Sequence, residues 1–216
     1  NFGDDNLYGG AGNDTLTDDQ GTNTLDGGDG NDNLTAQSLT GNQTLVGGSG
    51  YDNLNATGKN VTLDGGSDDD NLNADGRIHK NSQWEYTQNG NASLKGGDGN
   101  DTLFTRSYSS AELYGGKGDD NLSSGTDSAW SHWGGTRESV QNARLFGGEG
   151  NDRLHASVRG DGESYTGGNQ NLDQSAFLDG GSGNDTLDVR SYNSSKWAGS
   201  TKINTKAGDG DDSITI

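Results

Sequence analysis

The segment that decides the fold reads Gly9-Gly10-Ala11-Gly12-Asn13-Asp14-Thr15-Leu16, and versions of it return along the whole chain. Its general form is G-G-x-G-[N/D]-D-x-L. Copies begin at Gly9, Gly27, Gly47, Gly65, Gly96, Gly115, Gly147, Gly180 and, with alanine in the first place, Ala207. The sixth position is aspartate in every copy: Asp14, Asp32, Asp52, Asp70, Asp101, Asp120, Asp152, Asp185 and Asp212. The fifth position is Asn or Asp in all copies but one, which has Tyr51: Asn13, Asn31, Asp69, Asn100, Asp119, Asn151, Asn184 and Asp211. A flexible Gly/Asp-rich linker would not keep this pattern, so the chain is a repeat protein.

The composition excludes an ordinary hydrophobic core. The chain has 216 residues with 39 glycines, no cysteine, proline or methionine, and a formal net charge of −19. Leu, Ile, Val and Phe make up about 14 % of it, which is typical of a disordered chain unless something else holds it together. The absence of cysteine excludes disulfides and thiolate metal sites. The negative charge disfavours nucleic acid and anionic membranes, and no apolar run reaches the length of a membrane span. We therefore expect no nucleic-acid partner and no membrane insertion.

The repeated aspartates among glycines indicate bound Ca²⁺. Adjacent glycines allow a tight turn and the close approach of neighbouring turns, and carboxylates are the hard oxygen ligands that calcium prefers. The repeats, together with a partial copy at residues 3–7, hold 19 acidic and 2 basic residues, a net charge of −17. Carboxylates stacked about 4.8 Å apart would repel one another without cations. About eight Ca²⁺ ions between nine stacked turns would almost cancel this charge.

The repeats resemble the RTX (repeat-in-toxin, hemolysin-type) calcium-binding nonapeptide family of secreted bacterial proteins, whose pattern is that of a parallel β-helix. The resemblance implies an all-β, right-handed parallel β-roll in which each repeat is a turn followed by a short strand. It also implies calcium between stacked turns, export by a type I system, and a secreted or cell-surface location. We expect the ligands to come from the sixth-position and fifth-position side chains named above. Gly9, Gly27, Gly47, Gly65, Gly96, Gly115, Gly147 and Gly180 are the first-position residues expected at these sites.

The spacing of the copies predicts calcium turns on one side of the roll only. Copies start 18, 20, 18, 31, 19, 32, 33 and 27 residues apart, whereas a roll with calcium on both sides repeats every nine residues. On the other side, the place of the aspartate is taken by residues that can pack inward: Gln43, Val61, Ala92, Ala111, Ala143 and Ala176. Strand alternation then buries pairs such as Leu34 and Leu45. Such a core is thin, so we expect the chain to unfold without calcium.

We expect a single domain over residues 1–216, with regular rungs at 1–72 and rungs with long inserted connectors at 73–216. The connectors 73–93, 123–143, 155–176 and 188–205 should lie opposite the calcium turns. They carry all four tryptophans, and their candidate ligand-binding residues are Trp84, Tyr86, Trp130, Trp133 and Trp197. These aromatic residues either bind a glycan or a surface protein, or form small cores that hold the connectors against the roll.

Three functional hypotheses follow. The first is a calcium-folded module of an adhesin, within a larger polypeptide. The second is the carboxy-terminal secretion and folding module of a type I-secreted protease or lipase. The third is an ice-binding domain, suggested by outward rows such as Asn33, Asn53 and Asn71, although the row on the other strands ends in Glu112, Arg144 and Phe177. No catalytic motif is present, so we expect no enzymatic activity.

Overall fold

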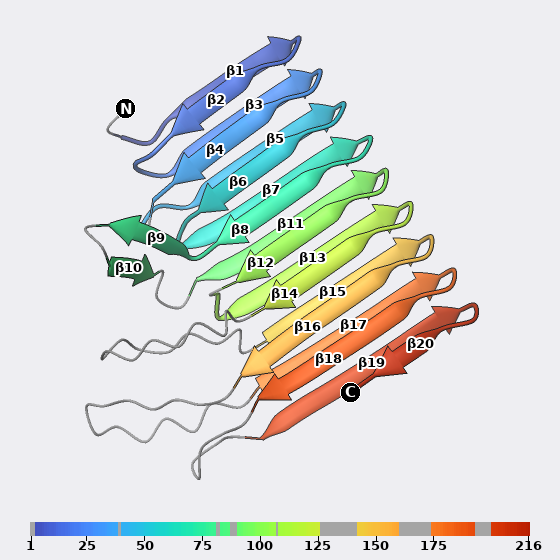
Figure 1. The fold of residues 1–216 in the computed structure, drawn as a ribbon. Helices are drawn as coiled ribbons and strands as arrows, with labels where there is room; N and C mark the ends of the chain where they lie inside the picture. The colour runs from blue at the N-terminus through green and yellow to red at the C-terminus, as the bar shows by residue number, and fades with distance from the viewer. Residues whose placement is uncertain are drawn as a thin grey trace, which may run out of the picture.

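The chain folds into two stacked parallel sheets. The computed structural model describes residues 3–38, 40–80, 83–86, 90–106, 108–125, 142–159, 174–192 and 200–216. These residues form strands, turns and bends but no helix, and therefore no helix that could cross a membrane. Figure 1 shows the strands as a regular ladder with tight loops along one edge. The expected all-β parallel roll is confirmed.

The nine-stranded first sheet contains the odd-numbered strands outside the hairpin described below, and every neighbouring pair in it is parallel. Its strands are β1 (Asn6–Ala11), β3 (Asn23–Asp29), β5 (Gln43–Ser49), β7 (Asn60–Ser67), β11 (Asn91–Asp98), β13 (Ser110–Lys117), β15 (Asn142–Glu149), β17 (Gln174–Ser182) and β19 (Thr201–Asp209).

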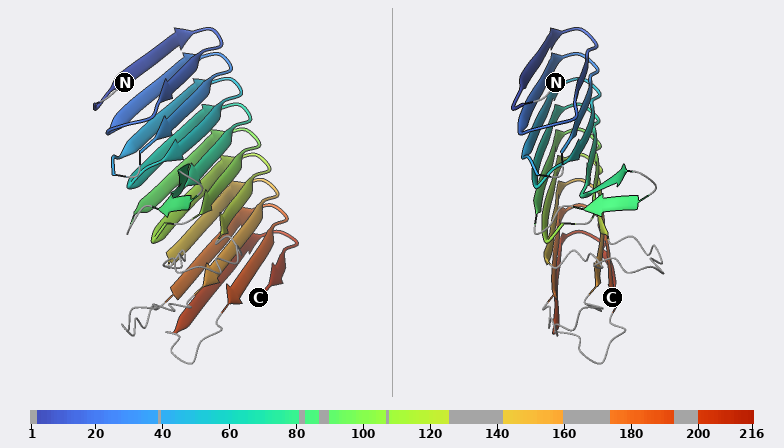
Figure 2. Two further views of the ribbon diagram at one scale, coloured as in Figure 1. Left: turned by 60° about the vertical axis from the view of Figure 1, so that its left-hand side comes forward. Right: turned by 90° about the vertical axis from the view of Figure 1, so that its left-hand side faces the viewer.

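The nine-stranded second sheet faces the first (Figure 2) and is also parallel throughout. Its strands are β2 (Thr15–Asp18), β4 (Asn33–Gln37), β6 (Asn53–Thr57), β8 (Asn71–Asp75), β12 (Thr102–Arg106), β14 (Asn121–Gly125), β16 (Arg153–Arg159), β18 (Thr186–Tyr192) and β20 (Ser213–Thr215).

One rung is a strand of the first sheet, a G-G-x-G-[N/D]-D turn and a strand of the second sheet. All nine turns therefore lie along one side of the roll, which we call the repeat edge. The opposite side, where the chain returns to the first sheet, is the connector edge. An antiparallel hairpin of β9 (Arg77–Lys80) and β10 (Gln83–Tyr86) leaves the roll there, next to the second sheet (Figure 2). The prediction of turns on one side, from the spacing of the copies, is confirmed.

The core is the inward face of both sheets. Strand alternation turns every second side chain inward, and the leucines of the middle rungs are almost completely buried. Ala92, Ala111, Ala143 and Ala176 are buried at the connector edge, as the sequence predicts, together with Gln43 and Val61. Leu7, Leu16 and Ile203, in the terminal rungs, are only partly buried because a neighbouring rung covers them on one side only.

Ion pairs join rungs that a long connector separates. Closing a longer loop costs more conformational entropy, and a contact between the flanking rungs offsets part of that cost. Each exposed pair contributes at most about 1 kcal/mol. The exposed pairs are Asp64–Lys95 at 3.2 Å, Glu112–Arg144 at 3.3 Å and Asp179–Lys206 at 3.0 Å, and a half-buried pair is Asp75–Arg106 at 2.6 Å.

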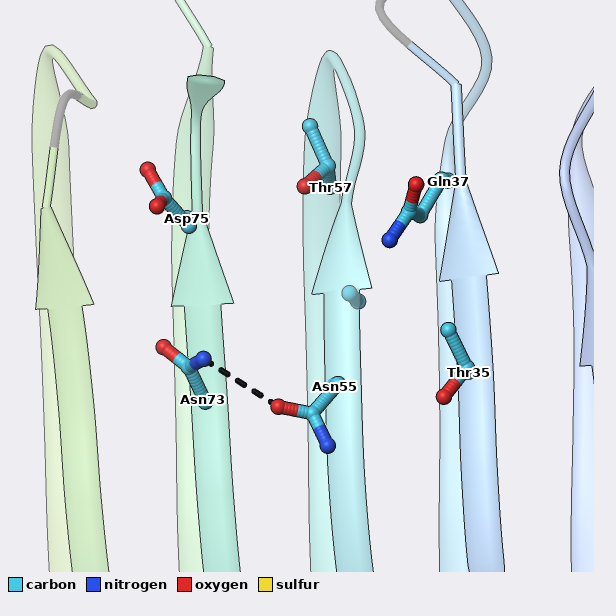
Figure 3. Close-up of a pocket in the computed structure, with 7 residues that line it drawn as sticks. Thr35, Gln37, Asn55, Thr57, Asn73 and Asp75 are labelled. Atoms are coloured by element: carbon cyan, nitrogen blue, oxygen red, sulfur yellow. Dashed lines mark hydrogen bonds between the residues drawn. The ribbon is translucent and has the colours of Figure 1, made fainter. Parts of the chain in front are cut away.

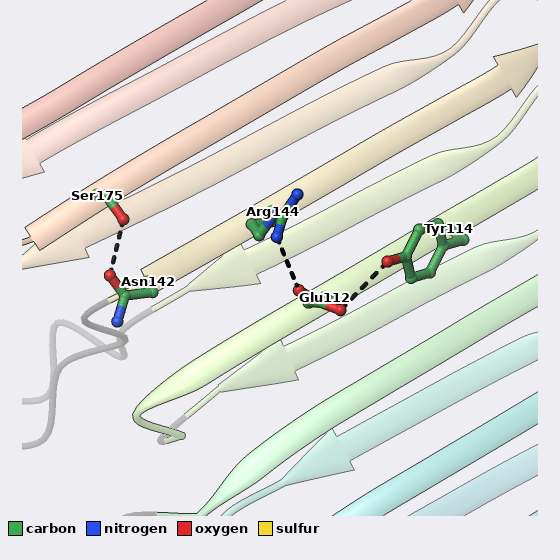
Figure 4. Close-up of polar contacts among 5 residues, drawn as sticks. All are labelled: Glu112, Tyr114, Asn142, Arg144 and Ser175. Carbon is green, nitrogen blue, oxygen red and sulfur yellow. Dashed lines mark hydrogen bonds and ion pairs between the residues drawn. The ribbon is translucent and has the colours of Figure 1, made fainter.

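Glu112 is the centre of one such contact on the outer face of the first sheet (Figure 4). It binds Arg144 of the next rung and accepts a hydrogen bond from the Tyr114 hydroxyl at 3.2 Å. Tyr114 also stacks on Phe146, with ring centroids 4.9 Å apart and planes within 3°, and Phe146 packs against Phe177 at 5.5 Å. These aromatic residues are cross-strand pairs, the usual unit of sheet stabilisation.

Candidate calcium centre

The sixth-position aspartates form a continuous ladder along the inside of the repeat edge. The backbone N–H of each aspartate donates to Oδ1 of the aspartate in the following rung, as Asp101 does to Asp120 at 2.8 Å. The same hydrogen bond recurs from Asp14 to Asp212 at 2.7–2.9 Å. The sixth-position aspartates from Asp32 to Asp185 are only 0–3 % exposed. The side chains therefore point into the stack rather than into solvent.

The second carboxylate oxygen of each aspartate, Oδ2, takes no part in this ladder. Oδ2 is buried and accepts no hydrogen bond in Asp14, Asp32, Asp52, Asp70, Asp101, Asp120, Asp152 and Asp185. Unpaired buried carboxylate oxygens cost free energy. Their repetition along the stack therefore indicates that they bind a positively charged group that is not part of the protein. A cation is such a group.

The first-position glycines keep a space open beside each of these oxygens. A Cβ atom at Gly115 would meet Oδ2 of Asp120 and the carbonyl oxygen of Gly147 in the next rung. The carboxylate and the carbonyl thus converge on the space that the glycine leaves. The same pair of oxygens surrounds Gly9, Gly27, Gly47, Gly65, Gly147 and Gly180, the last with the carbonyl of Ala207.

Burial makes this column electrostatically unfavourable without cations. Desolvation raises the pKa of Asp70 and Asp120 to about 7, although a backbone hydrogen bond lowers it and neighbouring carboxylates raise it further. The same causes, again led by desolvation, raise the pKa of Asp52, Asp101 and Asp152 to about 6 and also raise that of Asp185. Neighbouring positive charge would favour the ionised form.

The donor set fits Ca²⁺. Carboxylate and carbonyl oxygens are the ligands of a hard cation with six to eight oxygens, and the column contains neither histidine nor cysteine. Within the described parts of the chain, no group of three His, Cys, Asp or Glu side chains could hold a metal by itself. A cation here would depend on the backbone carbonyls as well as on the aspartates, which explains why glycine occupies the first position.

The fifth-position side chains have a different environment. They are exposed, and their hydrogen bonds run in the opposite direction along the roll: Asn151 N–H donates to Oδ1 of Asp119 in the preceding rung at 2.7 Å. The ladder contains Asn13, Asn31, Asp69, Asn100, Asp119, Asn151, Asn184 and Asp211. It is interrupted after Tyr51, which has no such oxygen.

Asp68 lies in the turn where this ladder is interrupted. It replaces the third glycine of its repeat, takes a positive φ of 77° and accepts a hydrogen bond from Gly50 N–H at 3.2 Å. Aspartate tolerates this backbone region better than most residues. The departure from the motif is therefore accommodated without changing the path of the turn.

The connector edge keeps a remnant of the same arrangement that the sequence analysis missed. The partial copy at residues 3–7 lies on this edge, and Asp5 N–H donates to Oδ1 of Asn23 in the next rung at 3.1 Å. Oδ2 of Asp5 is buried without a hydrogen-bond partner. The spacing in the sequence could have revealed this. Gly3 and Gly12 hold the same position of the motif, but they lie only nine residues apart, which is half a rung and places them on opposite edges.

Most of the predicted aromatic ligand site lies outside the described residues. Trp130, Trp133 and Trp197 fall in this undescribed part. Trp84 and Tyr86 belong to strand β10, of which the backbone alone is described.

A comparison with protein-family models gives one family, described as the RTX calcium-binding nonapeptide repeat. It matches residues 1–34, 39–58, 46–76, 86–107, 112–128, 142–157 and 177–190, more than half of the chain. No curated protein and no solved structure matches the chain significantly.

Proposed function

Because the chain belongs to the RTX calcium-binding nonapeptide repeat family, whose members form calcium-binding β-roll modules of bacterial proteins, we propose that this module folds only with calcium bound along its repeat edge. About eight ions lie between its nine turns. The ligands are Oδ2 of the sixth-position aspartates and the carbonyl oxygens of the first-position glycines. The bound calcium supplies the positive charge that the buried carboxylates lack.

The observation that carries this proposal is the column of buried Oδ2 atoms without partners. We do not include the fifth-position side chains among the ligands, because their Oδ1 atoms already accept backbone N–H groups of the next rung. Their role is to hold successive turns in register. The aspartates are thereby free to present one oxygen to the backbone and one to the cation.

The energies are large enough for calcium to decide folding. An ion at ten times its Kd stabilises the folded state by about 1.4 kcal/mol, so eight sites contribute on the order of 11 kcal/mol. Net stabilities of domains are about 5–15 kcal/mol. A roll with this thin core would lose all or most of its stability without the ions.

The test is a calcium titration of the chelator-treated protein, followed by far-UV circular dichroism and isothermal calorimetry. We expect a disordered spectrum in chelator, a cooperative change to a β spectrum on adding calcium, and a stoichiometry near eight. A chain that keeps its β spectrum in excess chelator would refute calcium-dependent folding. A stoichiometry of four or fewer would refute the assignment of one ion to each pair of turns.

We propose a secreted or cell-surface location for the module, where calcium is abundant enough to fill such sites, and an adhesin as the context. The support is the separation of two edges: the repeats turn along one, and the β9–β10 hairpin leaves the roll at the other. A glycan array with Trp130→Ala and Trp133→Ala variants tests this role, and binding that neither variant weakens refutes it. No structural observation favours a hydrolase over an adhesin. The row suggested for ice binding, Asn33 to Asn121, continues into Arg153, so it is not a flat regular array.

A further inference from the structure

A polar groove of about 300 Å³ lies on the outer face of the second sheet, away from the repeat edge (Figure 3). It crosses β4, β6 and β8, which are the last three strands of the second sheet before the first long connector. Its polar lining consists of Thr35, Gln37, Asn55, Thr57, Asn73 and Asp75. Thr35 is paired with Asn55, and Asn55 with Asn73, in the parallel register. Three neighbouring strands span about 10 Å, which is long enough for a short oligosaccharide.

The groove has spare hydrogen-bonding capacity. Asn73 donates through Nδ2 to Oδ1 of Asn55 at 3.1 Å, and Asn55 donates to Asn53 at 3.0 Å. This chain of bonds leaves Oδ1 of Asn73 buried with no partner. In the part of the chain that the structure describes, the side chains of Thr35, Gln37 and Thr57 make no hydrogen bonds. The free groups include both donors and acceptors, the combination that a sugar hydroxyl requires.

The groove is almost neutral, although the chain has a net charge of −19. Among the described residues that line it, Asp75 is the only charged one. Its carboxylate accepts from Nε of Arg106 at 2.8 Å and pairs with the same guanidinium at 2.6 Å. This ion pair balances the Asp75 carboxylate, so the described lining favours a neutral ligand over an ion.

Apolar surface borders the groove at its carboxy-terminal side. Phe104 is the register partner of Asn73 in the next strand, and the Arg106 guanidinium lies 5.5 Å from the centre of its ring. The Phe104 ring thus adds an apolar contact surface beside the polar lining.

We propose that this groove binds a short neutral oligosaccharide, whose hydroxyl groups pair with Thr35, Gln37 and the amide nitrogen of Asn73. The site requires only a folded roll and does not depend on which atoms hold calcium.

The experiment measures binding of the calcium-loaded protein to cellotriose, maltotriose, chitotriose and mannotriose by calorimetry. Acidic trisaccharides of the same length are included for comparison. The proposal expects at least one neutral trisaccharide to bind, Asn73→Ala to weaken that binding at least tenfold and Gln37→Ala at least threefold. The matched control is Asn121→Ala, which removes an exposed outward asparagine of the same sheet at β14 and should change affinity less than twofold.

Three results would overturn the proposal: no binding of any neutral trisaccharide, equal binding by the Asn73→Ala variant, or stronger binding of the acidic sugars. Circular dichroism of each variant in calcium shows whether it is folded. Gln37 is exposed at the end of its strand, so its substitution keeps the test informative if Asn73→Ala unfolds. Failure of sugar binding by a protein that folds on adding calcium refutes the groove and leaves the proposed function intact.

Discussion

The substitution Asp120→Asn should separate the two tasks of a sixth-position carboxylate. Oδ1 of Asp120 accepts the Asp101 N–H, and an asparagine keeps that acceptor. Oδ2 is buried without a partner, and it shares the space beside Gly115 with the carbonyl oxygen of Gly147. An amide group in its place can donate a hydrogen bond to that carbonyl but cannot bind a cation. We therefore expect the substitution to stabilise the roll in chelator and to lose much of that gain in calcium.

The loss of the ion acts only in calcium and opposes the gain from removing the buried charge, which is present in both buffers. Loss of one ion costs about 1.4 kcal/mol at ten times Kd and about 2.7 kcal/mol at a hundred times Kd. Without calcium, burial raises the Asp120 pKa to about 7, against roughly 3.9 in an unfolded chain. Keeping this carboxylate ionised in the folded state at pH 8 costs roughly 4 kcal/mol. The neutral asparagine avoids that cost.

The assay is urea unfolding at pH 8, followed by far-UV circular dichroism, in saturating calcium and in chelator. An excluded osmolyte added to the chelator buffer brings the calcium-free roll into a measurable range. The control is Asp98→Asn, which removes the same charge from a neighbouring repeat. Its side chain is 63 % exposed and pairs with Lys117 at 2.7 Å, so it should change stability by less than about 1 kcal/mol in either buffer. If Asp120→Asn changes stability equally in both buffers, or matches the control, the assignment of Oδ2 to a cation is wrong.

Three further outcomes are expected. In chelator, the β spectrum should be stronger at pH 5 than at pH 8, because the folded-state pKa of Asp70 and Asp120 is about 7 and their raised pKa makes stability fall as the pH rises through that range. Saturating calcium should reverse this trend, and a pH-independent spectrum in chelator would contradict it. Gly147→Ala should lower the calcium stoichiometry by about one in calorimetry, because its Cβ would meet Asp152 and the Gly180 carbonyl, whereas Gly125→Ala, with open space around it, should bind as the parent does. Arg106→Ala should cost about 1–2 kcal/mol in urea unfolding, because it removes a half-buried ion pair and a cation–π contact. Lys117→Ala, at an exposed pair, should cost less than half as much, and equal costs would show that burial of the pair is irrelevant.

The sequence by itself determined the architecture and the place of the calcium turns. A sixth-position aspartate in nine copies, one copy per rung, requires the turns to stack along one edge. Leucines and alanines at alternating positions specify the two inward faces, as the burial of Leu34, Leu45 and Ala111 confirms. These features follow from short-range periodicity, which a single chain displays directly.

The tertiary structure decided how each carboxylate is used. Both ladders consist of hydrogen bonds between residues 18 to 33 positions apart, and their opposite directions depend on the register between rungs. That register distinguishes the sixth-position oxygens left free from the fifth-position oxygens already used, a difference that the motif does not contain. The position of Asp5 on the connector edge and the groove around Asn73 depend on the same register. The physical reason is that connectors of unequal length lie between the rungs, so residues that become neighbours in space have no fixed separation in sequence.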